Sequence, residues 1–145
     1  MISPTIRSAE KNDSPQLAGL AGQLGYPSSA AQVAARLAEI LARPDQAVFV
    51  AEVEGQIAGW VHVYACWTVE SELYAEIGGL VVDINQRGQG VGKALMAQAE
   101  TWAGGLGIRE VRLRSNILRN EAHQFYQSIG YEIIKTQLTF RKNLQ

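Results

Sequence analysis

The stretch Gly78–Lys93 constrains the fold of this chain more than any other, and it reads GGLVVDINQRGQGVGK. It begins as an apolar strand, breaks after Val82, and then has glycine at every second position from Gly88 to Gly92. Apolar residues recur at helical spacing over Val91–Leu106, so the glycines fall in the turn between a strand and a helix. A helix N-terminus presents unpaired N–H groups, and glycine lets the backbone approach an anion closely. The stretch therefore predicts a phosphate-binding turn.

The spacing of these glycines excludes the two common nucleotide loops. A dinucleotide fingerprint would need a third glycine where the chain has Lys93 or Leu95. A Walker loop would need glycine at Arg87 and a hydroxyl residue at Ala94. Taken alone, the motif is equally compatible with an ordinary glycine-rich turn.

A second motif, NEAHQFYQSIGY, covers residues 120–131. The loop Arg87-x-x-Gly90-x-Gly92 resembles the pyrophosphate loop of the GNAT family of acyl-CoA-dependent N-acyltransferases, and residues 120–131 look like the closing motif of that family. The two motifs together span nearly half of the chain, and their order makes the joint match specific. One position departs from the family pattern: Arg119 stands where the family often has Asn. Either neighbour, Asn116 or Asn120, is then a candidate for contact with the pantetheine arm.

The resemblance implies an α+β fold in a single domain over residues 1–145. A GNAT fold has a central, mostly antiparallel sheet, here expected with six to seven strands, a splayed parallel pair at strands four and five, and about four helices. Alternating and apolar runs predict strands at 5–8, 47–53, 56–67, 73–82, 110–115, 131–135 and 137–141. Helical spacing and capping residues predict helices near 14–24, 29–43, 91–106 and 120–129.

The glycine pair Gly78-Gly79 lies inside an apolar strand and predicts a bulge there. A bulge would part this strand from its parallel neighbour and leave backbone groups of Leu80, Val81 and Val82 without partners, which the amide-bearing arm of coenzyme A could supply. A purely structural bulge is the alternative. The resemblance implies acetyl-CoA as cosubstrate. The residues expected to contact it are Leu80, Val81, Val82, Arg87, Gly88, Gln89, Gly90, Val91, Gly92, Lys93, Asn116 and Asn120.

Two residues are predicted to be catalytic. The resemblance implies direct transfer of the acyl group to an amine, with Tyr126 as general acid toward the thiolate. The thiol of the leaving group has a pKa of roughly 8.5, so protonation of the thiolate lowers the barrier only modestly. The attacking amine, with a pKa of roughly 10.4, must instead lose a proton at a cost of about 4.6 kcal/mol at pH 7. A base therefore matters more. The resemblance implies Glu76 for this role, because family members that use a base often place a carboxylate at this position; an ordered water is the alternative. The alternative roles are core packing for Tyr126 and an outward-facing position on the strand for Glu76. A backbone N–H near Leu80 or Val81 would donate a hydrogen bond to the oxyanion.

Charge and cysteine content narrow the class of protein further. The net charge of −1 hides an acidic first part and a basic second part, a distribution that suits a polyanionic ligand and a cationic amine but no nucleic acid. Cys66 is the single cysteine, so no internal disulfide and no cysteine-rich metal site is expected. The two histidines stand apart and predict no metal site. His62 alternates with Trp60 and Tyr64 on one strand face that borders either the substrate or a dimer partner.

The sequence thus predicts a cytoplasmic N-acetyltransferase that transfers the acetyl group of acetyl-CoA to a primary amine of a small molecule. No signal peptide or membrane span is recognised. In motif style residues 114–132 look most like aminoalkylphosphonate acetyltransferases, which implies a small anionic amine. A homodimer is the assembly considered. A non-catalytic acyl-CoA-binding sensor and a protein N-terminal or lysine acetyltransferase are the alternatives.

Overall fold

The computed structural model describes residues 3–145. The chain divides into two compact units, the first ending at Leu113 and the second covering Arg114–Gln145.

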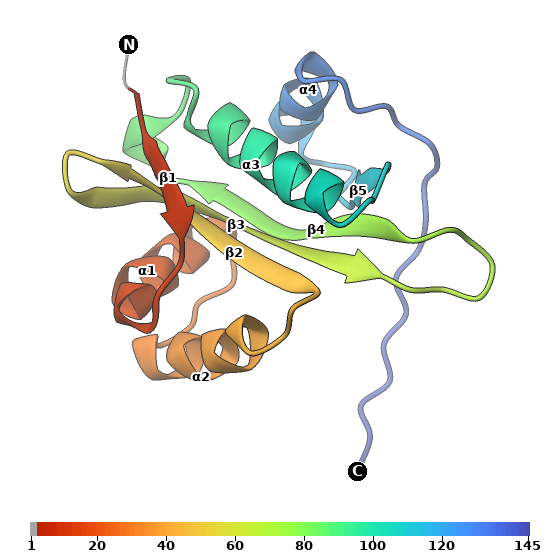
Figure 1. The fold of residues 1–145 in the computed structure, drawn as a ribbon, viewed down its shortest axis with the longest axis horizontal. Helices are drawn as coiled ribbons and strands as arrows, with labels where there is room; N and C mark the ends of the chain where they lie inside the picture. Colours follow the sequence, from red (N-terminus) through yellow and green to blue (C-terminus); the bar gives the residue numbers. More distant parts are fainter. Residues whose placement is uncertain (1–2) are drawn as a thin grey trace. The chain divides into compact units, whose positions relative to one another are not determined.

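The first unit is a five-stranded sheet with helices on both faces (Figure 1). Its strands lie in the order β1-β2-β3-β4-β5, and every neighbouring pair is antiparallel except β4 and β5, which are parallel. In chain order its elements are β1 (Thr5–Ser8), a short 3-10 helix η1 (Lys11–Asp13), α1 (Ser14–Leu24), α2 (Ala30–Leu41), β2 (Gln46–Val53), β3 (Gln56–Cys66), β4 (Tyr74–Val82), a 3-10 turn η2 (Ile84–Gln86), α3 (Val91–Gly105) and β5 (Val111–Leu113).

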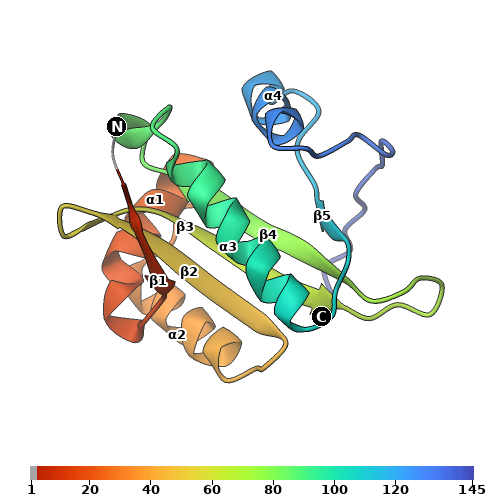
Figure 2. The ribbon, with the colours of Figure 1, turned by 45° about the horizontal axis from the view of Figure 1, so that its top comes forward.

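The helices α1 and α2 cover one face of this sheet and α3 covers the other (Figure 1; Figure 2). On the first face Leu17 and Leu37 pack with Val48 and other buried strand residues. On the other face the fully buried Leu95 of α3 lies beside Gly59 of β3. Because burying one such aliphatic side chain contributes about 1.5–3 kcal/mol, this three-layer packing holds the sheet that carries the site.

Local sequence explains where the helices on the first face begin and end. Ser29 caps α2, its hydroxyl accepting from Gln32 N–H at 3.1 Å while the Gln32 side chain accepts from Ser29 N–H at 2.9 Å. α1 has Pro15 in its first turn and ends at Gly25, whose φ of +101° is left-handed. These signals lie in the sequence itself, which is why both helices were predictable.

The predicted bulge in β4 is confirmed. Gly79 pairs with His62 whereas Ile77 pairs with Val63, so Gly78 is the extra residue on β4. The parallel pairing of β4 with β5 ends at Ile77, opposite Leu113, directly before the bulge. The predicted parallel pair at strands four and five is therefore present, although β5 is shorter than the expected 110–115.

The second unit contains α4 (Asn120–Ser128), which confirms the predicted fourth helix. The two strands expected at 131–135 and 137–141 are wrong: these residues form no strand in the described chain, so the sheet has five strands instead of six to seven. Their alternating pattern favours a strand, but a strand also needs a partner ladder, and none is formed by these residues. Leu138 and Phe140 accordingly remain 81% and 87% exposed.

Candidate functional site

The turn before α3 has the backbone geometry of an anion site. Gly88 and Gly90 have φ of +76° and +86°, and Gly90 is the N-cap of α3 without any side-chain cap. A Cβ at either glycine would meet nothing within 4 Å, so glycine is needed for the left-handed backbone and not for space. The first N–H groups of a helix have no intrahelical acceptor. Those of Val91–Lys93 are thus available to an anionic group.

The side chains of this turn are partly committed to its own structure. Asp83 Oδ1 accepts from Asn85 N–H at 3.1 Å, which shapes the exit from β4. Arg87 Nε donates to Val82 O at 3.2 Å, so this predicted phosphate ligand also holds the end of the strand. Lys93 is exposed on the first turn of α3, and Gln89 is half-buried in the loop. The turn therefore joins β4 to α3 through fixed hydrogen bonds.

The strand segment that leads into this turn has one unpaired edge. Leu80–Val82 pair with β3, opposite Val61, Trp60 and Gly59, and have no strand on their other side in the described chain. Backbone N–H and C=O groups need partners when they are removed from water. Leu80, Val81 and Val82 were predicted to contact coenzyme A together with the glycine turn. This geometry is consistent with that prediction, because the unpaired edge and the turn belong to one continuous stretch of chain.

The predicted base Glu76 is held by a neighbouring strand. It lies opposite Tyr64 in the β3–β4 ladder, and the Tyr64 hydroxyl donates to Glu76 Oε2 at 2.8 Å. Glu76 is half-buried, two residues before the bulge at Gly78. Glu76 is therefore not the exposed, outward-facing carboxylate that the sequence left open as the alternative.

A cavity of about 320 Å³ in the first unit reaches the bulge from the side of α1 and α2. Gly78 and Gly79 line it, together with His62 and Trp60 of β3. A Cβ on Gly78 would lie 2.8 Å from His62 Nδ1, and one on Gly79 would lie 3.0 Å from the Trp60 ring. A Cβ on Gly78 would force the His62 ring to move and one on Gly79 would press on the Trp60 ring, because the two rings lie directly against the backbone. The face of β3 that was expected to border either the substrate or a dimer partner therefore lines a cavity.

His62 is neutral in this wall. Its Nε2 lies 2.9 Å from Gln46 Oε1, an acceptor, so Nε2 carries the proton and Nδ1 is left as the acceptor. Burial lowers the pKa of His62, because a charged ring is poorly solvated there. A neutral imidazole with an acceptor nitrogen beside the bulge can receive an N–H from a ligand.

The second unit carries the remaining predicted residues. Tyr126 is half-buried on α4, with its ring centroid 5.2 Å from that of Phe125 and 6.2 Å from that of Tyr131. Burial raises the pKa of Tyr126, and the charge of Arg119 opposes this in part. The phenol is therefore protonated at neutral pH, as a general acid must be.

The two candidate asparagines differ in their environment. Asn116 organises the turn before α4, where its Oδ1 accepts from Leu118 N–H at 2.9 Å and its carbonyl accepts from His123 Nε2 at 2.8 Å. Asn120 is the exposed first residue of α4. Asn116 thus has a structural task that Asn120 lacks.

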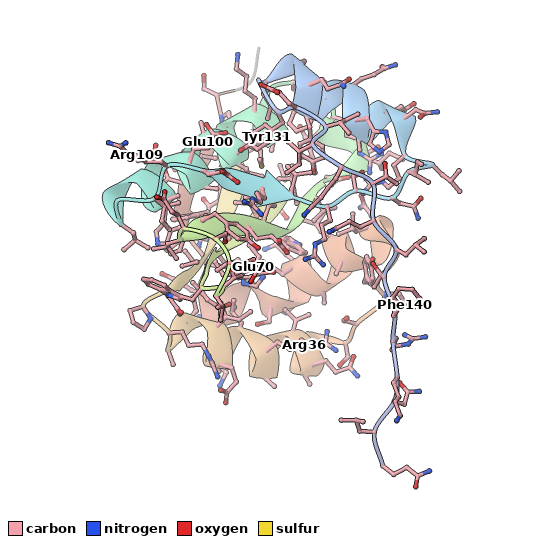
Figure 3. All side chains as sticks on the ribbon, turned by 90° about the vertical axis from the view of Figure 1, so that its right-hand side faces the viewer. Arg36, Glu70, Glu100, Arg109, Tyr131 and Phe140 are labelled. Atoms are coloured by element: carbon pink, nitrogen blue, oxygen red, sulfur yellow. The ribbon has the colours of Figure 1, made fainter. Side chains whose placement is uncertain are left out.

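Sequence reasoning missed several partners in the first unit. Two contacts depend on strand register: Tyr64 with Glu76, and Gln46 with His62. In the sequence, only the alternation Trp60-His62-Tyr64 indicated which side chains share a strand face. Arg36 also lines the cavity, from α2 (Figure 3), and nothing in its helical context indicated this. Within residues 3–145 no group of three or more His, Cys, Asp or Glu side chains could hold a metal ion, and no helix is long and apolar enough to cross a membrane.

Comparison with known proteins agrees with this geometry. The profile of the "Acetyltransferase (GNAT) family" matches residues 16–131. An aminoglycoside N(6')-acetyltransferase type 1 from Stenotrophomonas maltophilia is 31% identical over 99% of this chain and 95% of that protein. An aminoalkylphosphonate N-acetyltransferase from Salmonella typhimurium is 34% identical, over 54% of this chain and 51% of that protein.

Solved structures show the same fold. The aminoglycoside N-acetyltransferase AAC(6')-Iy, determined in complex with CoA, superposes with a TM-score of 0.88 at 23% identity, covering 99% of this chain and 97% of that one. The profile match, the full-length relative and the glycine turn after a strand with one unpaired edge lead to one assignment. The chain belongs to the GNAT family of acetyltransferases, enzymes that transfer the acetyl group of acetyl-CoA to an amine.

Proposed function

We propose that this protein transfers the acetyl group of acetyl-CoA to the primary amine of a small molecule. One observation carries the proposal: the unpaired edge of Leu80–Val82 leads directly into the uncapped N-terminus of α3 at Gly90. A carrier that has both amide groups and a diphosphate can use the two features together.

Each part of the carrier then has a partner on this chain. The amides of the pantetheine arm bond to Leu80–Val82 in the manner of an added strand, and the pyrophosphate accepts from the amides of Val91–Lys93. Arg87 and Lys93 neutralise phosphate charge. The N–H of Leu80 or Val81 donates to the thioester oxygen as negative charge develops there. On the second unit Asn120, which has no structural task in the turn, is favoured over Asn116 for the arm.

The acceptor amine must lose a proton before it attacks the thioester carbon. This costs about 4.6 kcal/mol for an amine of pKa roughly 10.4 at pH 7, so a positioned base has a large effect. Glu76 accepts the proton, directly or through a water molecule, and Tyr64 holds the carboxylate at the edge of the bulge.

The thiolate leaves as the new amide bond forms, and it takes up one proton. Tyr126 donates that proton, since its burial keeps the phenol protonated. The acceptor nitrogen, starting as an ammonium, loses two protons in one turnover. Glu76 passes the first to solvent, and the second, released as the amide forms, replaces the proton that Tyr126 gives to the thiolate.

A second acceptor class, the aminoglycosides, is favoured by one observation: the full-length relative from Stenotrophomonas maltophilia bears that name. It differs from the first only in the acceptor and uses the same carrier site.

Thiol release from acetyl-CoA with a panel of amines tests the proposal. The panel contains amino acids, aliphatic and aromatic amines, polyamines, tobramycin and a lysine-containing peptide, with a sample lacking amine as the control for hydrolysis. Amine-dependent release with a small molecule supports the proposal. Release with the peptide alone would indicate a protein acetyltransferase, and CoA binding without release for any amine would indicate a sensor.

A further inference from the structure

The walls of the cavity at the β4 bulge are mostly of one chemical kind. Most of its lining side chains are apolar and come from α1, α2 and β2. Its polar side chains are Tyr26, Ser28, Arg36 and His62, apart from the indole of Trp60, and no carboxylate is among the described residues that line it. Its volume of about 320 Å³ is at the small end of the range for ligand pockets. A compact ligand with an apolar body matches these walls.

The reacting amine belongs at the glycine floor of this cavity. Gly78 is the bulge residue, directly beyond the last residue of β4 that pairs with β5, so the cavity meets β4 next to the unpaired edge. His62 Nδ1, 2.8 Å from the position of a Cβ on Gly78, can accept a hydrogen bond from the amine. Since His62 is neutral, it does not repel an arriving ammonium group.

Arg36 provides a positive charge on the same cavity from a different element. It is exposed on α2 (Figure 3), and its Nη1 donates to Ser28 Oγ at 2.9 Å, which ties the guanidinium to the loop between α1 and α2. It is not part of any ion pair found within residues 3–145. A guanidinium has five N–H donors, so most of them remain for a ligand, and a carboxylate or another planar anion is the group that they bind best.

We infer that the acceptor is a primary amine with a compact apolar body and one anionic group, which Arg36 binds while the amine reaches Gly78. The inference rests on the proposed function and specifies its acceptor. An aminoglycoside would instead bring several ammonium groups into this cavity. Among the described residues that line it, Arg36 is the one with a formal charge, and that charge is positive. Like charges repel, no carboxylate is among the described residues that line the cavity, and Glu76 beside the bulge can compensate only one ammonium group, so such an acceptor is disfavoured.

Matched pairs of amines test this inference. L-Phenylalanine and phenethylamine share body and amine and differ in the carboxylate, as do L-leucine and isoamylamine; tobramycin serves as the polycation. Steady-state rates of acetylation are compared for wild type, Arg36→Gln, Ser28→Ala and a control, Arg43→Gln, whose arginine pairs with Glu39 and does not line the cavity. Melting temperatures verify that each variant is folded.

The wild type is expected to prefer the anionic member of each pair by tenfold or more in kcat/KM. Arg36→Gln should bring this ratio close to one by raising KM for the amino acid, while the uncharged amine stays within twofold. Ser28→Ala should weaken the preference partially, and Arg43→Gln should leave it unchanged.

Three results would overturn the inference: a preference that survives Arg36→Gln, a higher kcat/KM for tobramycin than for either amino acid, or acetylation of other panel amines but of neither pair. In each case amine-dependent thiol release persists, so the proposed function stands while the acceptor class falls. Absence of release with every amine would instead remove both.

Discussion

The hydroxyl of Tyr64 on β3 donates a hydrogen bond of 2.8 Å to Glu76 Oε2 on β4, two residues before the bulge. The pair lies on the sheet face that also carries His62 and borders the cavity. A carboxylate with one oxygen committed to a phenol is fixed in direction, which is what a base acting on a small amine requires.

Glu76→Gln should lower kcat by about 10²-fold or more, because the amide cannot take the proton of the amine. Tyr64→Phe should lower it less, since the base remains but is no longer oriented. The measurement is kcat between about pH 6 and 9, where Glu76→Gln should be slower than wild type throughout. An unchanged profile in Glu76→Gln would assign the proton to an ordered water.

Gly78→Ala should close the floor of the cavity. The new Cβ would sit 2.8 Å from His62 Nδ1, so the ring must move, at a cost of about 1–3 kcal/mol in stability. We expect KM for the amine to rise at least tenfold while affinity for CoA stays within threefold. Gly19→Ala on α1, where a Cβ meets nothing within 4 Å, is the matched control and should be slightly stabilising. Unaltered amine kinetics in Gly78→Ala would place the acceptor elsewhere.

Tyr126→Phe should reduce turnover by about tenfold to a hundredfold and leave CoA affinity unchanged. The effect is modest because a thiolate of pKa roughly 8.5 leaves readily without a proton. Burial raises the pKa of Tyr126, so the phenol keeps its proton over the whole working range and the loss should be similar from about pH 6 to 9. If stability falls in Tyr126→Phe but turnover does not, the residue belongs to the core.

Asp13 is expected to make the free energy of unfolding depend on pH. It is 6% exposed, and Arg7 donates to both of its carboxylate oxygens, each at 2.8 Å. These hydrogen bonds hold its pKa below the ordinary value, with burial acting in the opposite direction. The unfolded chain therefore binds this proton more readily, and the stabilisation is present above about pH 4 and lost as pH falls through the folded pKa.

Asp13→Asn should accordingly cost about 2 kcal/mol at pH 7, and the difference from wild type should shrink toward pH 2. Urea unfolding across this range measures it. Glu39→Gln removes an exposed pair with Arg43 and should cost less than about 0.5 kcal/mol. A pH-independent deficit in Asp13→Asn would mean that packing, and not the charge, is responsible.

Local signals were enough to predict the glycine turn, the bulge and the four helices. Positive φ at Gly88 and Gly90 and the capping role of Ser29 depend on residues close in sequence, so spacing revealed them. The contact of Tyr64 with Glu76 depends on a β3–β4 register shifted by one residue at Gly78, which no local pattern specifies.

The two strands expected after Tyr131 failed for a related reason. Alternation over 131–141 gives strand propensity, but a ladder is formed only with a partner, and the sequence does not name one. A single domain, a homodimer and a cytoplasmic location stay predictions.

The most direct test of the central claim is a titration of the ¹⁵N-labelled protein with CoA, followed by amide chemical shifts, in wild type and Gly90→Val. Valine at a φ of +86° is strained, and it should remove the turn while leaving the sheet resonances in place. In wild type the largest shifts should fall on the amides of Leu80–Val82 and Val91–Lys93, and Gly90→Val should abolish them. Shifts concentrated on other elements, or full CoA affinity in Gly90→Val, would contradict the account.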